Sequence, residues 1–385
     1  MSDTNRFQLR YVEEPVFGTT PASALTDLRN TGESLSYNIS TIASEEIRSD
    51  RQITDLIQTT AESAGVINLE LSYSTYDDFL KAALFSSGWS TTVAVAGTDI
   101  AADNSGSQYT STSTDFTTEN IVVGQWIKVA GFTAAGANGY FKVTSVAANA
   151  LGVTPAPAVE AATNPITMAG SYIRNETTQT SFSLEKEFSD ITQFISYVGM
   201  IPSTLDMTVA TGSVINGSIG FIGLGSAADT STIGTGSPTA ANTNEVMNAV
   251  DNIGFIWEGG SAVSGINITE ISQSLNNNLR GLDAVGTLGH VDIGDGQCMV
   301  TGTLNAYFAD TTIYEKYLNA TSSSISFRVN DAAGNSYIFT YPRIEYTTGN
   351  IVAGSANSDV MANMGWQATR DSTTDATIQI DRFVA

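Results

Sequence analysis

Alternating apolar and polar residues mark the clearest strands of this chain. Residues 67–73 alternate in this way, and residues 182–188 follow the same pattern. Alternation with a period of two predicts a strand with one buried face. Residues 325–329 and 337–341 alternate on either side of the turn-forming run 331–335, which predicts a β-hairpin.

Two short segments have helical spacing instead. In residues 76–84 the apolar positions recur every three or four residues, which places them on one face of a helix. Ser74 and Asp77 have the spacing of a capping box, and Gly88 is expected to end this helix. Thr312 and Glu315 have the same spacing at the start of a second helix. Each of the two helices is predicted to follow a strand directly.

The two helical segments also resemble each other. Tyr76-Asp-Asp-Phe-Leu-Lys-Ala aligns with Tyr314-Glu-Lys-Tyr-Leu-Asn-Ala, and Ile201-Pro202 aligns with Tyr341-Pro342. Residues 214–221 are echoed by residues 360–366. These similarities predict an internal duplication. The alternative is two unrelated β-domains that share a common strand-helix motif.

The duplication defines the expected domains. Residues 1–89 and 172–225 form a first β-unit, and residues 246–385 form a second unit of nearly equal length. Residues 90–171 interrupt the first unit and contain strands of their own, so they predict a small inserted β-barrel or immunoglobulin-like sandwich. Residues 226–245 are rich in Gly, Ser and Thr and are interpreted as a flexible linker or a long loop.

Composition and charge narrow the function. The 385 residues include 16 Lys and Arg against 39 Asp and Glu, which gives a formal net charge of −23. This sign argues against a general nucleic-acid binder and against binding to anionic membranes. One cysteine, Cys298, cannot form an intrachain disulfide and suggests folding in a reducing compartment. No stretch is apolar enough to predict membrane insertion.

At this point the sequence resembles the tail tube proteins of long-tailed, non-contractile bacteriophages. The residues that carry the resemblance occur in a fixed order along the chain. They are Phe7-Gln-Leu-Arg-Tyr-Val-Glu-Glu-Pro-Val-Phe-Gly-Thr-Thr-Pro, Leu35-Ser-Tyr-Asn-Ile-Ser, Glu45-Glu-Ile-Arg-Ser-Asp-Arg-Gln, the segment 67–84 and Ser181-Phe-Ser-Leu-Glu-Lys-Glu-Phe.

The resemblance implies a mainly β fold, in which tail-tube-type β-sandwich or barrel units with a flanking helix polymerise as stacked rings. Because this chain has two such units, we expect trimeric rings with pseudo-sixfold symmetry, the alternative being hexameric rings. The resemblance also implies that the protein is part of the virion tail and that the tail is assembled in the host cytoplasm. The implied partners are further copies of the chain, the tape measure protein, the tail terminator and distal tail proteins.

A tail tube must let double-stranded DNA pass without retaining it. A negative wall repels phosphate over a Debye length of about 8 Å at physiological salt. We therefore expect acidic residues on polar strand faces to line the bore. The candidates are Glu70, Glu185, Glu187, Asp292 and Asp295.

The segment 44–64 is long and polar, with charges of both signs. In the family that this chain resembles, the corresponding loop reaches the adjacent ring. We expect Arg48 and Arg51 to form ion pairs between subunits that fix the stacking of rings, with Glu46, Asp50 and Asp55 beside them. The alternative is a solvated loop, because exposed ion pairs contribute little. The matching segment 275–297 has fewer charges.

The remaining sequence motifs do not indicate an enzyme. His290, Asp292, Asp295 and Cys298 lie close together, but their spacing matches no standard metal site and two glycines favour a turn. No catalytic residue, metal or cofactor is therefore expected. Two alternative functions stay open, namely a surface or fibre protein that binds host glycans and an acidic hydrolase with paired carboxylates.

Overall fold

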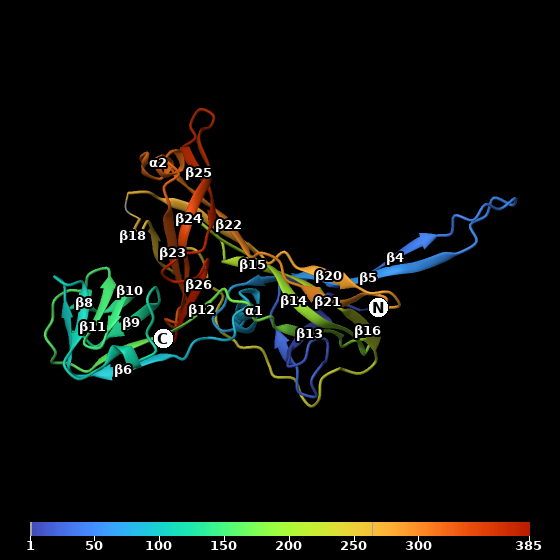
Figure 1. Cartoon of the computed structure of the whole chain (residues 1–385), viewed down its shortest axis with the longest axis horizontal. Coiled ribbons are helices and arrows are strands. Elements are labelled where there is room, and N and C mark those ends of the chain that lie inside the picture. Colours follow the sequence, from blue (N-terminus) through green and yellow to red (C-terminus); the bar gives the residue numbers. More distant parts are fainter. Residues whose placement is uncertain (1, 264) are drawn as a thin grey trace.

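The structure, a computed structural model, describes residues 2–263 and 265–385 and confirms a mainly β fold. Its β-structure is arranged in sandwich-like layers, and the two α-helices of the described residues each flank one part of the sandwich (Figure 1). Within those residues, the helices are all too short to cross a bilayer.

The first unit is assembled from chain on both sides of a long insertion. Its elements are η1 (Thr4–Arg6), β1 (Phe7–Glu14), β2 (Thr26–Leu28), β3 (Gly32–Glu33), β4 (Ser36–Ala43), β5 (Leu56–Glu70), α1 (Asp77–Ala83), β13 (Ser181–Phe188), β14 (Gln193–Ala210), β15 (Asn216–Gly223) and β16 (Gly225–Asp229). One layer has the strand order β4–β5–β15–β14, and the other has the order β2–β1–β13–β14–β16. The long strand β14 belongs to both layers.

The second unit repeats this arrangement. Its elements are β17 (Ile253–Glu258), β18 (Ser261–Ala262), β19 (Ile268–Asn276), β20 (Arg280–Asp283), β21 (His290–Gly294), β22 (Met299–Tyr307), α2 (Thr312–Leu318), β23 (Ser323–Asn330), β24 (Ser336–Ala353), β25 (Val360–Ala368) and β26 (Gln379–Phe383). Its layers have the orders β19–β22–β25–β24 and β18–β17–β23–β24–β26. The same strand order therefore occurs twice, which favours duplication over two unrelated domains.

Irregularities in the sheets align the two units residue by residue. A bulge separates Pro202 from Thr204 in β14, and another separates Tyr346 from Thr348 in β24. These bulges make Thr348 the equivalent of Thr204. The glycines opposite them, Gly220 and Gly365, would each bring an added Cβ within 2.4 Å of the threonine Oγ1.

The helices align differently from the sequence-based prediction. Both are seven residues long, and each is followed by a residue with a left-handed backbone, Phe85 with φ 51° and Ala320 with φ 47°. This makes Lys81 the equivalent of Lys316, so the predicted pairing of Tyr76 with Tyr314 was wrong by three residues. Because such a shift is nearly one helical turn, it preserves the apolar face and misleads a sequence comparison.

The predicted caps were also wrong. Tyr76 and Thr311 occupy the N-cap positions, and neither makes a side-chain hydrogen bond to the helix backbone. The first helix ends at Ala83 with Leu84 at the C-cap, and the left-handed residue that follows is Phe85 rather than Gly88.

Strand pairing joins the two units into one sheet. β14 of the first unit pairs with β19 of the second from Thr204↔Asn276 to Ala210↔Glu270. The result is a continuous eight-stranded sheet with the order β4–β5–β15–β14–β19–β22–β25–β24. A common hydrophobic core runs beneath both units.

The insertion has a separate core. Its elements are β6 (Val93–Gly97), β7 (Ile100–Asp103), β8 (Gln108–Ser111), η2 (Phe116–Thr118), β9 (Trp126–Ala130), η3 (Ala135–Ala137), β10 (Gly139–Ala147), β11 (Ala150–Thr154) and β12 (Ile166–Arg174). The insertion leaves the first unit but packs on the second. Trp126 lies against Phe255 and Trp257, and the end of β12 pairs with β26.

The segment interpreted as a flexible linker or a long loop is anchored to the first unit. Residues 226–229 lie in β16, which pairs with β14. Further along, the Thr239 backbone bonds to Leu25 and Asp27, and Val246 forms a bridge with Ser72. The segment is therefore a long loop held along the surface of the first unit.

Candidate assembly surfaces

The eight-stranded sheet has one apolar face and one polar face. In β14, Leu205, Met207 and Val209 point into the core, whereas Thr204, Asp206 and Thr208 alternate with them. β19 and β22 alternate in the same way. We call the side opposite the core the polar face.

Residues that pair across neighbouring strands form two rows on the polar face. The first row consists of Asn68, Ser218, Asp206, Ser274, Thr301, Gln367 and Glu345. The second row consists of Glu70, Asn216, Thr208, Ser272, Thr303, Gly365 and Thr348. Both rows contain mainly Ser, Thr and Asn, so the surface is polar with little charge.

The charge that the sheet does carry is almost entirely negative. The eight strands contain the acids Glu62, Glu70, Asp206, Glu270 and Glu345. Arg343 is the single Lys or Arg in these described strands, and its Nη2 lies 3.2 Å from Oε1 of Glu345. The sheet therefore offers a face with net negative charge.

The structure separates the five acids predicted to line a bore. Glu70 lies on the polar face at the end of β5. Asp292 and Asp295 are exposed on and just after β21, where Asp295 accepts a hydrogen bond from Gln179. Glu62, Asp206, Glu270 and Glu345 were missed, although the alternation within residues 203–209 is the signal that would have identified Asp206.

Glu185 and Glu187 lie in the other layer, on β13. Glu185 is completely buried, and it accepts hydrogen bonds from Thr232 Oγ1 at 2.8 Å and from the Ile233 N–H at 2.7 Å. Glu187 forms an ion pair with Arg10. The burial of Glu185 contradicts the expectation that it lines a passage. The ion pair with Arg10 neutralises Glu187, whose place at a bore stays a prediction.

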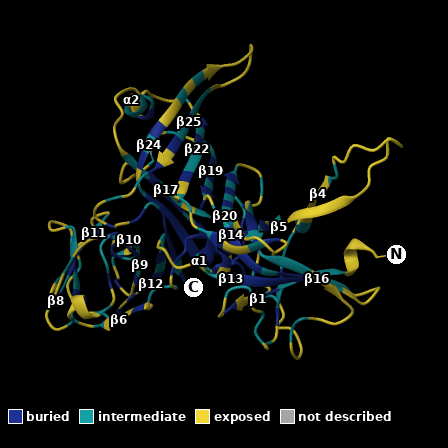
Figure 2. Ribbon diagram, turned by 45° about the vertical axis from the view of Figure 1, so that its right-hand side comes forward, coloured by how far each residue is buried: buried dark blue, intermediate teal, exposed yellow. Residues whose placement is uncertain are grey.

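Both ends of the eight-stranded sheet lack a further strand partner among residues 2–263 and 265–385. β4 pairs with β5 on one side, and the second half of β24 pairs with β25 on one side. Figure 2 shows β4 and the outer part of β24 with exposed residues. Unpaired strand edges carry backbone groups that readily bind another strand, so they are natural assembly surfaces.

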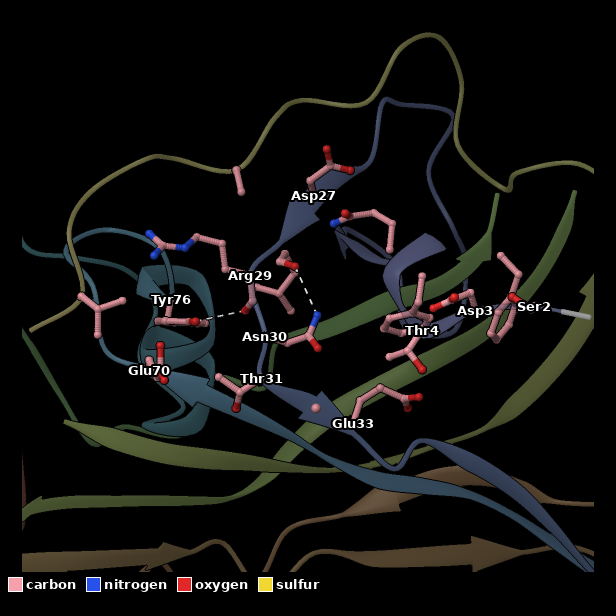
Figure 3. A pocket seen from close by; sticks show the side chains of 17 residues that line it. Ser2, Asp3, Thr4, Asp27, Arg29, Asn30, Thr31, Glu33, Glu70 and Tyr76 are labelled. Carbon is pink, nitrogen blue, oxygen red and sulfur yellow. Dashed lines mark hydrogen bonds between the residues drawn. The ribbon is translucent and has the colours of Figure 1, made fainter. Parts of the chain in front are cut away.

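A groove of about 860 Å³ lies along the edge next to β3. Figure 3 shows Asn30, Glu33 and Glu70 around it, and Phe7 and Phe188 also line it. Side chains fill the corresponding position of the second unit. There Ile271 and Val329, the equivalents of Glu33 and Phe188, are buried in the common core together with Val209 from β14.

A comparison with known families bears on the functions suggested by the sequence. Residues 4–368 match the family model described as phage tail tube protein. The chain belongs to the phage tail tube protein family. No curated protein matched in a separate comparison. The family match covers nearly the whole chain and favours a structural component of the virion tail over a glycan-binding fibre or a hydrolase.

In this tail tube protein, the hairpin of β4 and β5 extends away from the body as an arm (Figure 1). All five residues predicted for ring stacking lie in its tip and are exposed. Arg48 Nη2 lies 2.8 Å from Oδ2 of Asp50, and this guanidinium lowers the pKa of the Asp50 carboxyl. Thr54 Oγ1 donates to Glu46, and Asp55 accepts from the Leu56 N–H. The arm therefore holds these charges mainly through contacts within itself.

The arm also exposes apolar side chains that the charge pattern did not indicate. They are Ile39, Ile42, Ile47, Ile53, Leu56 and Ile57. A group of large apolar residues on an extended segment favours an interaction surface over a solvated loop.

The equivalent segment of the second unit folds differently. Between β19 and β22, the strands β20 and β21 form a short hairpin that folds back on the first unit. Ile293 of β21 is buried against Phe85 and Ile201. One of the two repeated hairpins is therefore used within the chain, and the other remains free.

Proposed function

We propose that this protein is the major tail tube subunit and that the polar face of its eight-stranded sheet forms the wall of the DNA passage. The observation that carries the proposal is the polar face itself, with five acids against one cation in its strands. Uncharged Ser, Thr and Asn side chains offer no strong binding site for phosphate. The acids repel phosphate at short range, so duplex DNA slides without being held.

We further propose that three copies close one ring. Strands spaced about 4.8 Å apart and tilted by about 40° give three eight-stranded sheets a closed wall roughly 48 Å across between backbones. Six copies would give a wall of about twice that diameter. Since each chain already contains two units, the three-chain ring has six similar units and pseudo-sixfold symmetry.

The arm is proposed to contact the adjacent ring. Its exposed isoleucines supply the apolar contact, and Arg48 and Arg51 with Glu46, Asp50 and Asp55 set the register between rings. The inserted domain, which packs on the outer layer of the second unit, is proposed to face outward. Assembly in the host cytoplasm and contacts with the tape measure protein, the tail terminator and distal tail proteins belong to the same proposal.

Electron microscopy of the purified protein tests the assembly. We expect hollow tubes, or discs with a central hole. Molecules that stay monomeric at high concentration, under conditions in which tail proteins assemble, would contradict the proposal.

DNA retention tests the wall. The variant Asp206→Lys combined with Glu270→Lys changes the charge of the polar face by four units per chain without altering the strand edges. Tubes of this variant are expected to co-sediment with linear duplex DNA at low salt, whereas the native tubes do not. A control with Asp115→Lys and Glu119→Lys carries the same charge change on the inserted domain. Equal retention of DNA by both variants would contradict the proposal that the polar face forms the wall of the passage.

A further inference from the structure

The pairing of β14 with β19 inside the chain shows how one unit joins the next. β14 supplies the second half of a long strand, and β19 supplies the edge strand of the layer β19–β22–β25–β24 in the following unit. The equivalents of these two strands are β24 and the β3–β4 segment, and each of them has an open edge. We propose that β24 of one copy pairs with β3–β4 of a second copy in the register of this internal junction. The inference rests on the proposed function, because it describes how the ring closes.

The register follows from equivalent positions. The bulges in β14 and β24 make Thr348 the equivalent of Thr204. Gly65 faces Phe221 as Gly302 faces Trp366, which makes these two glycines equivalent and Asn38 the equivalent of Asn276. Because Thr204 pairs with Asn276, Thr348 is placed opposite Asn38 of the second copy.

Hydrogen bonds support this equivalence independently. Tyr197 donates from its hydroxyl to the Leu35 carbonyl oxygen at 3.0 Å. Its equivalent, Tyr341, donates to Oε1 of Gln273, the equivalent of Leu35. The same tyrosine therefore contacts the same strand position in both units.

Backbone direction is also correct for pairing. At the internal junction, the Asn277 N–H donates to Ser203 and the Thr211 N–H donates to Thr269, so odd-numbered residues of β14 bond across it. Their equivalents in β24 are Gly349, Ile351 and Ala353. Alternation in an antiparallel ladder directs the backbone groups of these residues to the open edge.

The groove beside β3 fits the incoming strand. In the second unit, Met207 and Val209 of β14 fill the corresponding space and are buried. Ile351 and Ala353 are their equivalents in β24, so they would cover Phe7 and Phe188 at the groove of the second copy. The groove is then the unfilled counterpart of a contact that the chain already makes once.

The two rows of the polar face would continue through this junction. The second row leaves Glu70 of one copy, ends at Thr348 and passes through Asn38 to Glu62 of the second copy. It returns to β5 eight residues from where it began. A stagger of this kind is what tilts the strands of a closed barrel.

The free chain protects the edge that this junction would use. The Leu35 N–H donates to Glu33 at 2.8 Å, and Lys186 Nζ donates to the Leu35 carbonyl oxygen at 2.7 Å beside Tyr197. Charged side chains at an unpaired edge oppose premature association. On ring closure, backbone hydrogen bonds to Ile351 of the neighbouring copy would replace these side-chain hydrogen bonds to Leu35.

Engineered disulfides test the register. Thr348 and Asn38 would face each other as a pair without direct hydrogen bonds, where Cα atoms are about 4.5 Å apart and suit a disulfide. The test variant is Asn38→Cys with Thr348→Cys in a Cys298→Ser background. On oxidation of assembled protein, we expect a covalent ladder that ends at three chains.

Two matched variants control the test. Thr204→Cys with Asn276→Cys occupies the same positions at the internal junction and is expected to form a link within one chain. Asn38→Cys with Val352→Cys is four residues out of register, about 13 Å along the strand, and is expected to remain unlinked.

The outcomes separate the two proposals. Tubes in electron micrographs without the Asn38–Thr348 link, or with the out-of-register link instead, would overturn the register and leave the tube function intact. A ladder that ends at six chains would support the register and overturn the three-chain ring. The absence of rings and tubes from native and variant protein alike would overturn both proposals.

Discussion

The junction between the two units and the open edges of the sheet are the same structural position in two states. At the internal junction, Ile271 and Phe327 are buried in a continuous core. At the open edge their equivalents are Glu33 and Lys186, which form an ion pair at 2.6 Å. A contact made once during folding can be apolar, whereas an edge that must wait for another molecule keeps charge next to it.

Replacing Met207 by proline tests the internal state and has the largest expected effect. Met207 is buried, and its N–H lies on the side of β14 that faces β19. Loss of the side-chain packing and of one ladder bond is expected to lower the free energy of unfolding by about 3–5 kcal/mol. Chemical denaturation measures this loss. Met207→Leu, which keeps the N–H, should cost less than about 1.5 kcal/mol.

The same substitution at the open edge should affect assembly instead of folding. Ile351 is the equivalent of Met207, and its N–H is directed away from β25. Ile351→Pro is expected to reduce ring formation at least about tenfold, since a lost hydrogen bond and a misplaced backbone weaken each junction. Sedimentation velocity measures ring formation. Ile351→Val should assemble normally, and equal assembly by the proline variant would contradict the junction.

The ion pair at the open edge gives a smaller effect. Lys186→Met leaves Glu33 partly buried without its cation and is expected to cost about 2 kcal/mol of stability. Combining it with Glu33→Leu copies the apolar character of the second unit and should restore most of that loss. Urea denaturation of the single and double variants provides the measurement. Equal stability of the two variants would show that the ion pair does not explain the difference between the edges.

The insertion contributes a pH-dependent contact with the second unit. Asp381 of β26 accepts a hydrogen bond from the Trp126 N–H, and burial raises the pKa of its carboxyl to about 7. Because the unfolded carboxyl ionises near pH 4, the unfolded state binds fewer protons between these values. The free energy of unfolding is therefore expected to fall as pH rises from about 4 to 7, with a slope no steeper than the binding of one proton gives. Asp381→Asn should flatten this part of the profile, and an unchanged slope would assign it to other groups.

Alternation and turn chemistry were sufficient to predict much of the fold. The hairpin of β23 and β24 and the strand character of residues 67–70 are found as expected, because these segments have one buried face and a clear turn. The repeat was visible in the sequence, but its register was not. The prediction aligned Ile201-Pro202 with Tyr341-Pro342. The bulges instead make Tyr346 the equivalent of Pro202.

The candidate surfaces were harder to predict because they depend on tertiary contacts. Glu185 lies on an alternating strand, yet the loop at Thr232 covers it and residues 181–186 of the strand are all buried. The insertion is continuous with the first unit in sequence, but the aromatic contact of Trp126 places it on the second. Local pattern identifies a strand face, and only the packing of distant segments shows which face stays open.

A cryo-EM reconstruction of the assembled tube tests the central claim most directly. The account expects three chains in each ring, with β24 of every chain paired to β4 of its neighbour and the polar face turned toward the bore. Six chains in a ring, or a bore lined by the layer that contains β13, would contradict it.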